Sequence, residues 1–302
     1  MELKSLIATG VRGLQPYQPG KPVEELEREL GITGIIKLAS NENPKGSSPK
    51  VAAALRSILD GLGRYPDGSG FTLKEKLSEH LGVESAQLAL GNGSNDVLEM
   101  ITRSFVQPGE GVVISEHAFA VYELSARSVN AAIKIVPAKG FGHDLDGMAA
   151  AITSDTRLVF IANPNNPTGT HLSRAKIVDF LSALPDHVIT VLDEAYFEYV
   201  SAPEYPNGLT LLADFPNLVV TRTFSKAYGI AGLRVGYSVA SAEITEVLNR
   251  VRQPFNVNSL ALAGAQAALC DQAFVAQSVL ENRDGLEFLT RALGELGLEV
   301  IP

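Results

Sequence analysis

The sequence predicts an α/β fold built around a mostly parallel sheet with helices on both faces. Short apolar runs bounded by turn residues alternate with segments whose apolar residues recur three and four positions apart, the pattern of strands alternating with helices. The 302 residues suffice for about two domains with a real core. Hydrophobic residues make up 45% of the chain and charged residues 20%, which excludes wholesale disorder.

Helical spacing identifies the predicted helices, and turn residues mark their ends. The first helix follows a Pro/Gly-rich arm and ends at Gly31, since glycine readily adopts the left-handed conformation that closes a helix. A turn-rich stretch at 41–49 leads into the second. The predicted helices cover 23–31, about 49–59, 71–82, 95–106, 243–253 and the long tract 260–297.

Apolar runs between turn residues are the predicted strands. They cover 87–90, 111–115, 132–137, 157–163, 187–195, 217–223 and 234–240. Such a sheet binds its ligands at the carboxyl ends of its strands. The last letters, LEVIP at 298–302, read as the start of a further strand that has nothing to run into. We therefore expect the chain to be a fragment.

Charge and cysteine usage exclude several classes of function. The net charge of −9 argues against binding to nucleic acid. No apolar run approaches the ~18 residues of a membrane span, and the opening residues lack the core of a signal peptide, so we expect a cytoplasmic protein. Cys270 is the lone cysteine and the five histidines are scattered, so no metal site is predicted.

Four segments place small or polar residues at or directly after an apolar run. They are GNGSND at 91–96, NPNNPTG at 163–169, DEAYFEY at 193–199 and TFSKAYGIAGLRVG at 223–236. An α/β fold would bring these strand ends together in one crevice. Together they supply a lysine, an aspartate, an arginine, amides and hydroxyls. This set suits a phosphorylated aromatic cofactor with a ring nitrogen and an aldehyde, namely pyridoxal 5'-phosphate.

The same motifs resemble those of the fold-type I aminotransferases, most closely the histidinol-phosphate aminotransferase family. The resemblance covers nearly the whole chain, from GLQPYQPGKP near the start to PFNVNSLA at 254–261. It implies a large domain on a mostly parallel mixed sheet and a smaller α/β domain. We expect an N-terminal arm with part of the small domain at 1–45, the cofactor-binding domain at 46–250, and an incomplete C-terminal small domain at 251–302.

The resemblance implies that Lys226 is the catalytic Schiff-base lysine and that Arg234 grips the cofactor phosphate. Alone, each would be read as an ordinary surface or ion-paired side chain. Thr223 and Ser225 would add hydroxyls to the phosphate site. The turn Gly93, Ser94, Asn95 would add backbone N–H groups at a helix start, although Ser94 could instead serve as a helix N-cap.

The resemblance also assigns the groups around the cofactor ring. Asp193 would pair with the ring nitrogen, with Glu194 as the competing choice. Asn166 and Tyr196 would bind the ring's 3-oxygen, although an Asn-Pro pair is also a common turn. Phe119 would stack on the ring in place of a tyrosine, or could equally be a core residue.

Three further positions are implied to act on the substrate or across a dimer. Tyr65 matches a tyrosine that reaches the neighbouring subunit's cofactor phosphate, which would require a homodimer with composite active sites. Tyr17 and Asn41 match substrate-side positions, and either could instead anchor a loop.

The implied reaction is transamination between a small-molecule amino donor and a 2-oxo acid. The family's reaction converts L-histidinol phosphate and 2-oxoglutarate to imidazole-acetol phosphate and L-glutamate in histidine biosynthesis. Alternatives that share the motifs are an aromatic amino-acid aminotransferase and a phosphothreonine-type decarboxylase. A non-catalytic cofactor-binding remnant is the third alternative.

Overall fold

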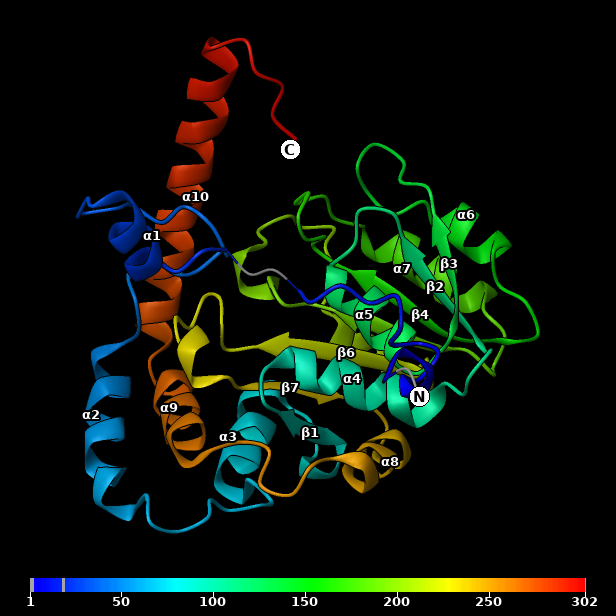
Figure 1. Ribbon diagram of the computed structural model, residues 1–302, viewed down its shortest axis with the longest axis horizontal. Helices are drawn as coiled ribbons and strands as arrows, with labels where there is room; N and C mark the ends of the chain where they lie inside the picture. The colour runs from blue at the N-terminus through cyan, green and yellow to red at the C-terminus, as the bar shows by residue number, and fades with distance from the viewer. Residues whose placement is uncertain (1–2, 18–19, 302) are drawn as a thin grey trace.

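A mixed seven-stranded sheet forms the centre of the computed structural model, which describes residues 3–17 and 20–301 (Figure 1). The strands lie in the order β1-β7-β6-β5-β4-β2-β3. Only β7 runs antiparallel to its neighbours among the described residues, so the predicted mostly parallel sheet is confirmed. All the predicted internal strands form: β1 Leu88–Gly91, β2 Gly111–Ser115, β3 Ala132–Val136, β4 Thr156–Ala162, β5 Ile189–Asp193, β6 Leu218–Thr223 and β7 Gly236–Val239.

The predicted helices are confirmed, with one difference near the C-terminus. Gly31 takes a φ of 66° and closes the first helix as expected. The predicted helical tract 260–297 is helical, but it is divided into two helices because the chain bends by 80° around Cys270. The helices are α1 Val23–Leu30, α2 Pro49–Ile58, α3 Phe71–Leu81, α4 Ser94–Phe105, α5 Ala120–Ser128, α6 Leu145–Ala150, α7 Arg174–Ala183, α8 Ala242–Val251, α9 Ser259–Leu269 and α10 Gln272–Glu295.

Helices cover both faces of the sheet, which explains why its strands are apolar throughout. In β4, Leu158 and Phe160 pack into the cluster formed with α4, α5 and α8. The intervening Val159 and Ile161 pack on the other side, against α6 and α7. Alternate side chains of one strand therefore enter two cores. A third cluster joins β1 and β7 to α2, α3 and α9.

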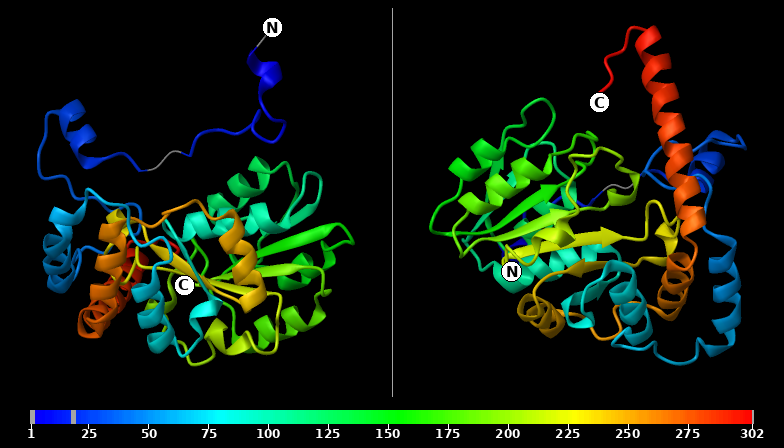
Figure 2. Two further views of the ribbon diagram at one scale, coloured as in Figure 1. Left: turned by 90° about the horizontal axis from the view of Figure 1, so that it is seen from below. Right: turned by 180° about the vertical axis from the view of Figure 1, so that it is seen from behind.

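The two ends of the chain lie apart from these cores. Helix α1 has no buried residue and stands off the sheet in Figure 2. The predicted strand at 298–302 does not form over residues 298–301, which follow α10 without strand structure and lie at a distance from the described sheet (Figure 1). Residue 302 is outside the described range. The division into segments at 45 and 250 stays a prediction.

The strand directions determine where polar side chains collect. Because β1, β2, β4, β5 and β6 run the same way, their carboxyl ends meet at one edge of the sheet. Strand β7 runs the other way and therefore begins at that edge. This reversal brings the residues just before Gly236 to the ends of the other strands.

Among the described helices, no single one is long and apolar enough to cross a membrane. Helices α9 and α10 reach that length and composition only as a pair, and the pair is sharply bent.

Candidate active site

A cavity of about 490 Å³ lies at this edge of the sheet. Its walls come from the segments after β1, β2, β4, β5 and β6 and from the N-terminal arm. Every predicted site residue lines it except Gly93 and Tyr65. The lining residues among those predicted are Tyr17, Asn41, Ser94, Asn95, Phe119, Asn166, Asp193, Tyr196, Thr223, Ser225, Lys226 and Arg234.

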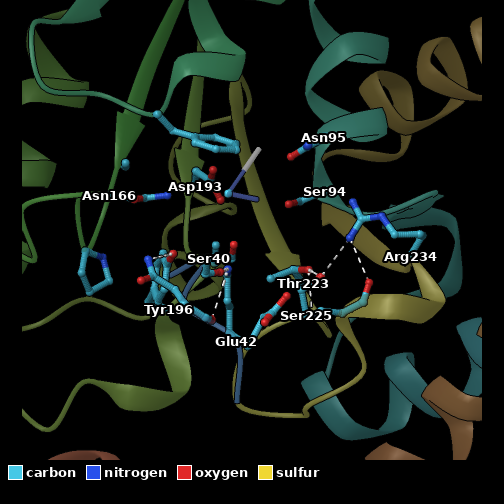
Figure 3. Close-up of a pocket in the computed structure, with 18 of the residues that line it drawn as sticks. Ser40, Glu42, Ser94, Asn95, Asn166, Asp193, Tyr196, Thr223, Ser225 and Arg234 are labelled. Atoms are coloured by element: carbon cyan, nitrogen blue, oxygen red, sulfur yellow. Dashed lines mark hydrogen bonds between the residues drawn. The ribbon is translucent and has the colours of Figure 1, made fainter. Parts of the chain in front are cut away.

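Arg234 and nearby hydroxyls form the cationic end of the cavity (Figure 3). The Arg234 guanidinium donates through Nη1 to the Ala231 carbonyl at 3.1 Å and lies 3.5 Å from Ser225 Oγ. Thr223 Oγ1 donates to Ser225 Oγ at 3.0 Å. Within the described part of the chain, no acidic side chain forms an ion pair with Arg234. The guanidinium is therefore available for an anion in the cavity.

The start of α4 closes this end. Gly93, at φ 81°, precedes the helix, and a Cβ there would lie 2.3 Å from Arg234 Nη2. Gly93 therefore makes room for the arginine rather than lining the cavity. Ser94 is the first helical residue, so the alternative that it serves as the N-cap is wrong. The Asp96 side chain, in the first turn of α4, accepts a hydrogen bond from the Asn92 backbone N–H at 2.8 Å.

Asp193 lies buried at the centre of the cavity, where β5 ends. Its Oδ2 accepts the Tyr122 hydroxyl at 2.7 Å, and its Oδ1 accepts the Thr221 hydroxyl at 2.9 Å. Burial raises the pKa of Asp193, and these two hydrogen bonds oppose the rise. The competing Glu194 does not line the cavity and is paired with the buried Arg222 at 2.7 Å. The geometry thus distinguishes two adjacent carboxylates that the sequence could not.

Lys226 follows β6, and its side chain lines the same cavity as Arg234 and Asp193. Its Nζ lies 3.2 Å from the Ser40 carbonyl and 3.4 Å from the Asn41 carbonyl. Burial lowers the pKa of Lys226, and the charge of Arg234 lowers it further. The carboxylates of Glu42 and Asp193 oppose the shift. The net effect favours the neutral amine, which is the nucleophilic form.

Amide and phenol groups occupy the side wall. The Tyr196 hydroxyl accepts from Asn41 Nδ2 at 2.9 Å, and burial raises its pKa. Figure 3 shows Asn166 and Tyr196 on one side of the cavity and Ser94 and Arg234 on the other, with Asp193 between them. The cavity therefore presents a cationic end, an acidic centre and a neutral polar wall.

Of the three aromatic residues other than Tyr196 that were predicted for the site, Phe119 and Tyr17 line the cavity and Tyr65 does not. Phe119 lines the cavity just before α5, and its ring meets the Tyr122 ring edge-on at 5.8 Å between centroids. Tyr65 lies outside the cavity with 81% of its surface exposed, stacked on Phe255 at 4.7 Å. Tyr17 lines the cavity and is 57% exposed. One chain therefore does not bring Tyr65 to its own site.

Sequence reasoning missed four residues at this site. Ser40 and Glu42 line the cavity beside Lys226, and Thr221 and Tyr122 hold Asp193. The helical spacing of Tyr122, three residues after Phe119, is the signal that could have identified it. No group of three metal-ligating side chains is close enough together to hold an ion in the described parts of the chain.

Comparison with known proteins gives the family. Residues 33–302 match the model of the family described as aminotransferase class I and II. The chain belongs to the class I and II aminotransferases. A histidinol-phosphate aminotransferase of Methylococcus capsulatus is 56% identical, over 100% of this chain and 83% of that protein. One from Pseudomonas fluorescens is 57% identical, over 99% of this chain and 81% of that protein.

A solved structure extends the likeness to three dimensions. Histidinol-phosphate aminotransferase from Sinorhizobium meliloti, in complex with pyridoxal-5'-phosphate, superposes with a TM-score of 0.90 at 31% identity. The match covers 99% of this chain and 80% of that one. The predicted fold-type I aminotransferase fold is therefore confirmed, and the cavity described above is that of an aminotransferase.

Proposed function

We propose that this aminotransferase uses pyridoxal 5'-phosphate to transfer the amino group of L-histidinol phosphate to 2-oxoglutarate, giving imidazole-acetol phosphate and L-glutamate, in histidine biosynthesis. Identity above 55% over essentially the whole chain to two histidinol-phosphate aminotransferases carries the proposal. The cavity supports it, because Lys226, Asp193 and Arg234 all line it.

The residues present fit pyridoxal 5'-phosphate. Arg234, which has no acidic partner among the described residues, suits a phosphate together with the hydroxyls of Thr223 and Ser225 and the start of α4. At the centre of the cavity, the buried carboxylate of Asp193 suits a cationic ring nitrogen, which would offset the cost of burying the charge. Lys226 is within the same cavity.

Each side chain then has a distinct task. When bound, the cofactor supplies an aldehyde for the amino group and a ring that withdraws electrons. Lys226 would move a proton from the substrate α-carbon as general base and acid, a task that its lowered pKa favours. Asp193 would hold the ring nitrogen, Asn166 and Tyr196 would bind the ring oxygen, and Phe119 would pack on the ring.

Substrate-side residues are proposed on the arm. Tyr17 and Asn41 line the cavity, and Asn41 donates a hydrogen bond to the Tyr196 hydroxyl. Both are therefore placed to contact the amino donor or the oxo acid rather than the cofactor ring.

We further propose a cytoplasmic homodimer whose sites are shared. The stacked pair Tyr65 and Phe255 is solvent-exposed, and the apolar side chains of Leu59, Leu62 and Phe71 are also exposed. Exposed apolar clusters of this kind are typical of interfaces. Tyr65 lies on this surface and matches a tyrosine that, in the family, reaches the neighbouring subunit's cofactor phosphate, so we propose the same reach for Tyr65 of a second copy.

A panel of amino donors tests the proposed reaction. The cofactor-loaded protein is mixed with L-histidinol phosphate, phenylalanine, tyrosine, glutamate and phosphothreonine, and the cofactor's absorbance is followed through one half-reaction. We expect L-histidinol phosphate and glutamate to convert the cofactor to its amino form, and Lys226→Ala to abolish the change. Faster conversion by the aromatic amino acids, or release of CO2 from phosphothreonine, would replace the proposed substrate.

A further inference from the structure

A buried tyrosine lies behind the acidic centre of the cavity. Tyr122 is fully buried on α5, and its hydroxyl donates to Asp193 Oδ2 at 2.7 Å. Its ring stacks parallel on Phe160 of β4, with 4.6 Å between centroids and 4° between planes. Burial raises the pKa of Tyr122 well above its usual value, so the hydroxyl stays protonated and donates.

The position of Tyr122 on its helix links two parts of the site. Phe119 precedes α5, and Tyr122 follows one turn later, with the two rings in edge-on contact. Thr221 of β6 donates to the other carboxylate oxygen, so each oxygen of Asp193 has a side-chain donor, and the Ala195 backbone N–H is a further donor to the carboxylate. The carboxylate can therefore turn only by breaking a buried hydrogen bond, which is costly.

We propose that Tyr122 is a positioning residue that acts through Asp193. Its hydroxyl fixes the carboxylate plane and keeps the carboxylate aimed at the ring nitrogen of the cofactor. Phe119, which would pack on the cofactor ring, lies directly before the helix that carries Tyr122. This inference rests on the proposed cofactor. It goes beyond the proposed function because it assigns a role to Tyr122, which acts on Asp193 and not on the substrate or the reacting atoms.

The test compares two cofactors on the full chain after the resident cofactor is removed. One is pyridoxal 5'-phosphate, and the other is its 1-deaza analogue, in which a C–H replaces the ring nitrogen. Tyr122→Phe removes the hydroxyl and keeps the ring stack. Tyr237→Phe is the matched control, because it removes the hydroxyl of another buried tyrosine, one that interacts with Arg222 rather than Asp193. Thermal unfolding of each apo-protein reports the stability change.

We expect Tyr122→Phe to raise the Kd of pyridoxal 5'-phosphate by about 10-fold, the value of one hydrogen bond to a charged group, and to leave the Kd of the deaza analogue within about 2-fold. Tyr237→Phe should lower the melting temperature and leave both Kd values unchanged. A merely structural role for Tyr122 would instead move both cofactors together.

Equal weakening of the two cofactors by Tyr122→Phe, or no weakening of either, would overturn the inference. These outcomes are distinct from failure of the proposed function. If the wild-type chain binds neither cofactor, the proposed function is wrong. If it binds pyridoxal 5'-phosphate and Tyr122→Phe shows no selective loss, only the role of Tyr122 is wrong.

Discussion

At the scale of single residues, Arg234 shows a backbone adapted to a charge. Its φ of 59° lies in the left-handed region, which costs a non-glycine residue on the order of 1 kcal/mol. The conformation lies between the short helix Ala231–Leu233 and β7, and it turns the guanidinium toward Ser225. A residue with a strained backbone therefore supplies the cationic end of the cavity.

Replacing Arg234 should weaken the binding of a phosphate much more than it destabilises the fold. We predict that Arg234→Gln raises the Kd of pyridoxal 5'-phosphate by about 100-fold, since charge-assisted bonds to the phosphate are lost. The melting temperature of the apo-protein should change little. Arg250→Gln is the control, because Arg250 pairs with Glu246 on the exposed face of α8. Titration by fluorescence quenching measures the Kd of pyridoxal 5'-phosphate for each variant. Equal Kd values for Arg234→Gln and Arg250→Gln would contradict the assignment of Arg234 to the phosphate.

At the scale of elements, the cavity depends on how closely α4 approaches β7. A Cβ on Gly236 would lie 2.4 Å from the backbone nitrogen of Ser94, so only glycine allows the first turn of α4 to reach the strand. The same approach places the free N–H groups of the helix beside Arg234. Packing of two elements, rather than one motif, therefore builds the anion site.

A methyl group at this contact should separate the two elements. We predict that Gly236→Ala lowers the free energy of unfolding by about 2 kcal/mol and weakens cofactor binding. Gly285→Ala is the matched control in α10, where an added Cβ meets nothing within 4 Å, and it should stabilise by about 0.5–1 kcal/mol. Chemical denaturation measures both. A neutral Gly236→Ala would show that α4 is free to shift.

Elements were predictable where burial on both faces leaves an apolar run, as in β4 and β5. The same rule failed at LEVIP, because a strand also needs a neighbour and residues 298–301 have none beside them. The bend near Cys270 was not predicted, because no glycine or proline marks it in the sequence.

Among the site residues, Lys226, Arg234 and Asn166 could be assigned to the cavity from sequence motifs. Tyr122 belongs to none of these motifs, and its role depends on the fold, which brings its hydroxyl to Asp193 at the end of β5.

At the scale of the whole molecule, the exposed apolar surface is uneven. On α10, Leu286, Phe288 and Leu289 are each more than half exposed, where the helix rises away from the sheet (Figure 1). A second exposed group surrounds Tyr65 and Phe255. Only the second group carries a residue that the family motif links to the cofactor, and for this reason we place the dimer interface there.

Hybrid dimers test whether active sites are shared. Mixing Lys226→Ala chains with Tyr65→Phe chains should create hybrids in which one site has neither lesion. For random pairing of a two-fold dimer, about a quarter of wild-type activity should return. Activity that stays at the level of the separate parents, with hybrids demonstrated by mass spectrometry, would show that each chain completes its own site.

The central claim is that the strand ends assemble one cofactor site in which Lys226 is the nucleophile. Borohydride reduction of the cofactor-loaded protein, followed by peptide mapping, tests it most directly. We predict a single labelled peptide containing Lys226, labelling that is lost in Lys226→Ala, and no label on the exposed Lys50. Label recovered on another lysine, or labelling that persists in Lys226→Ala, would contradict the account.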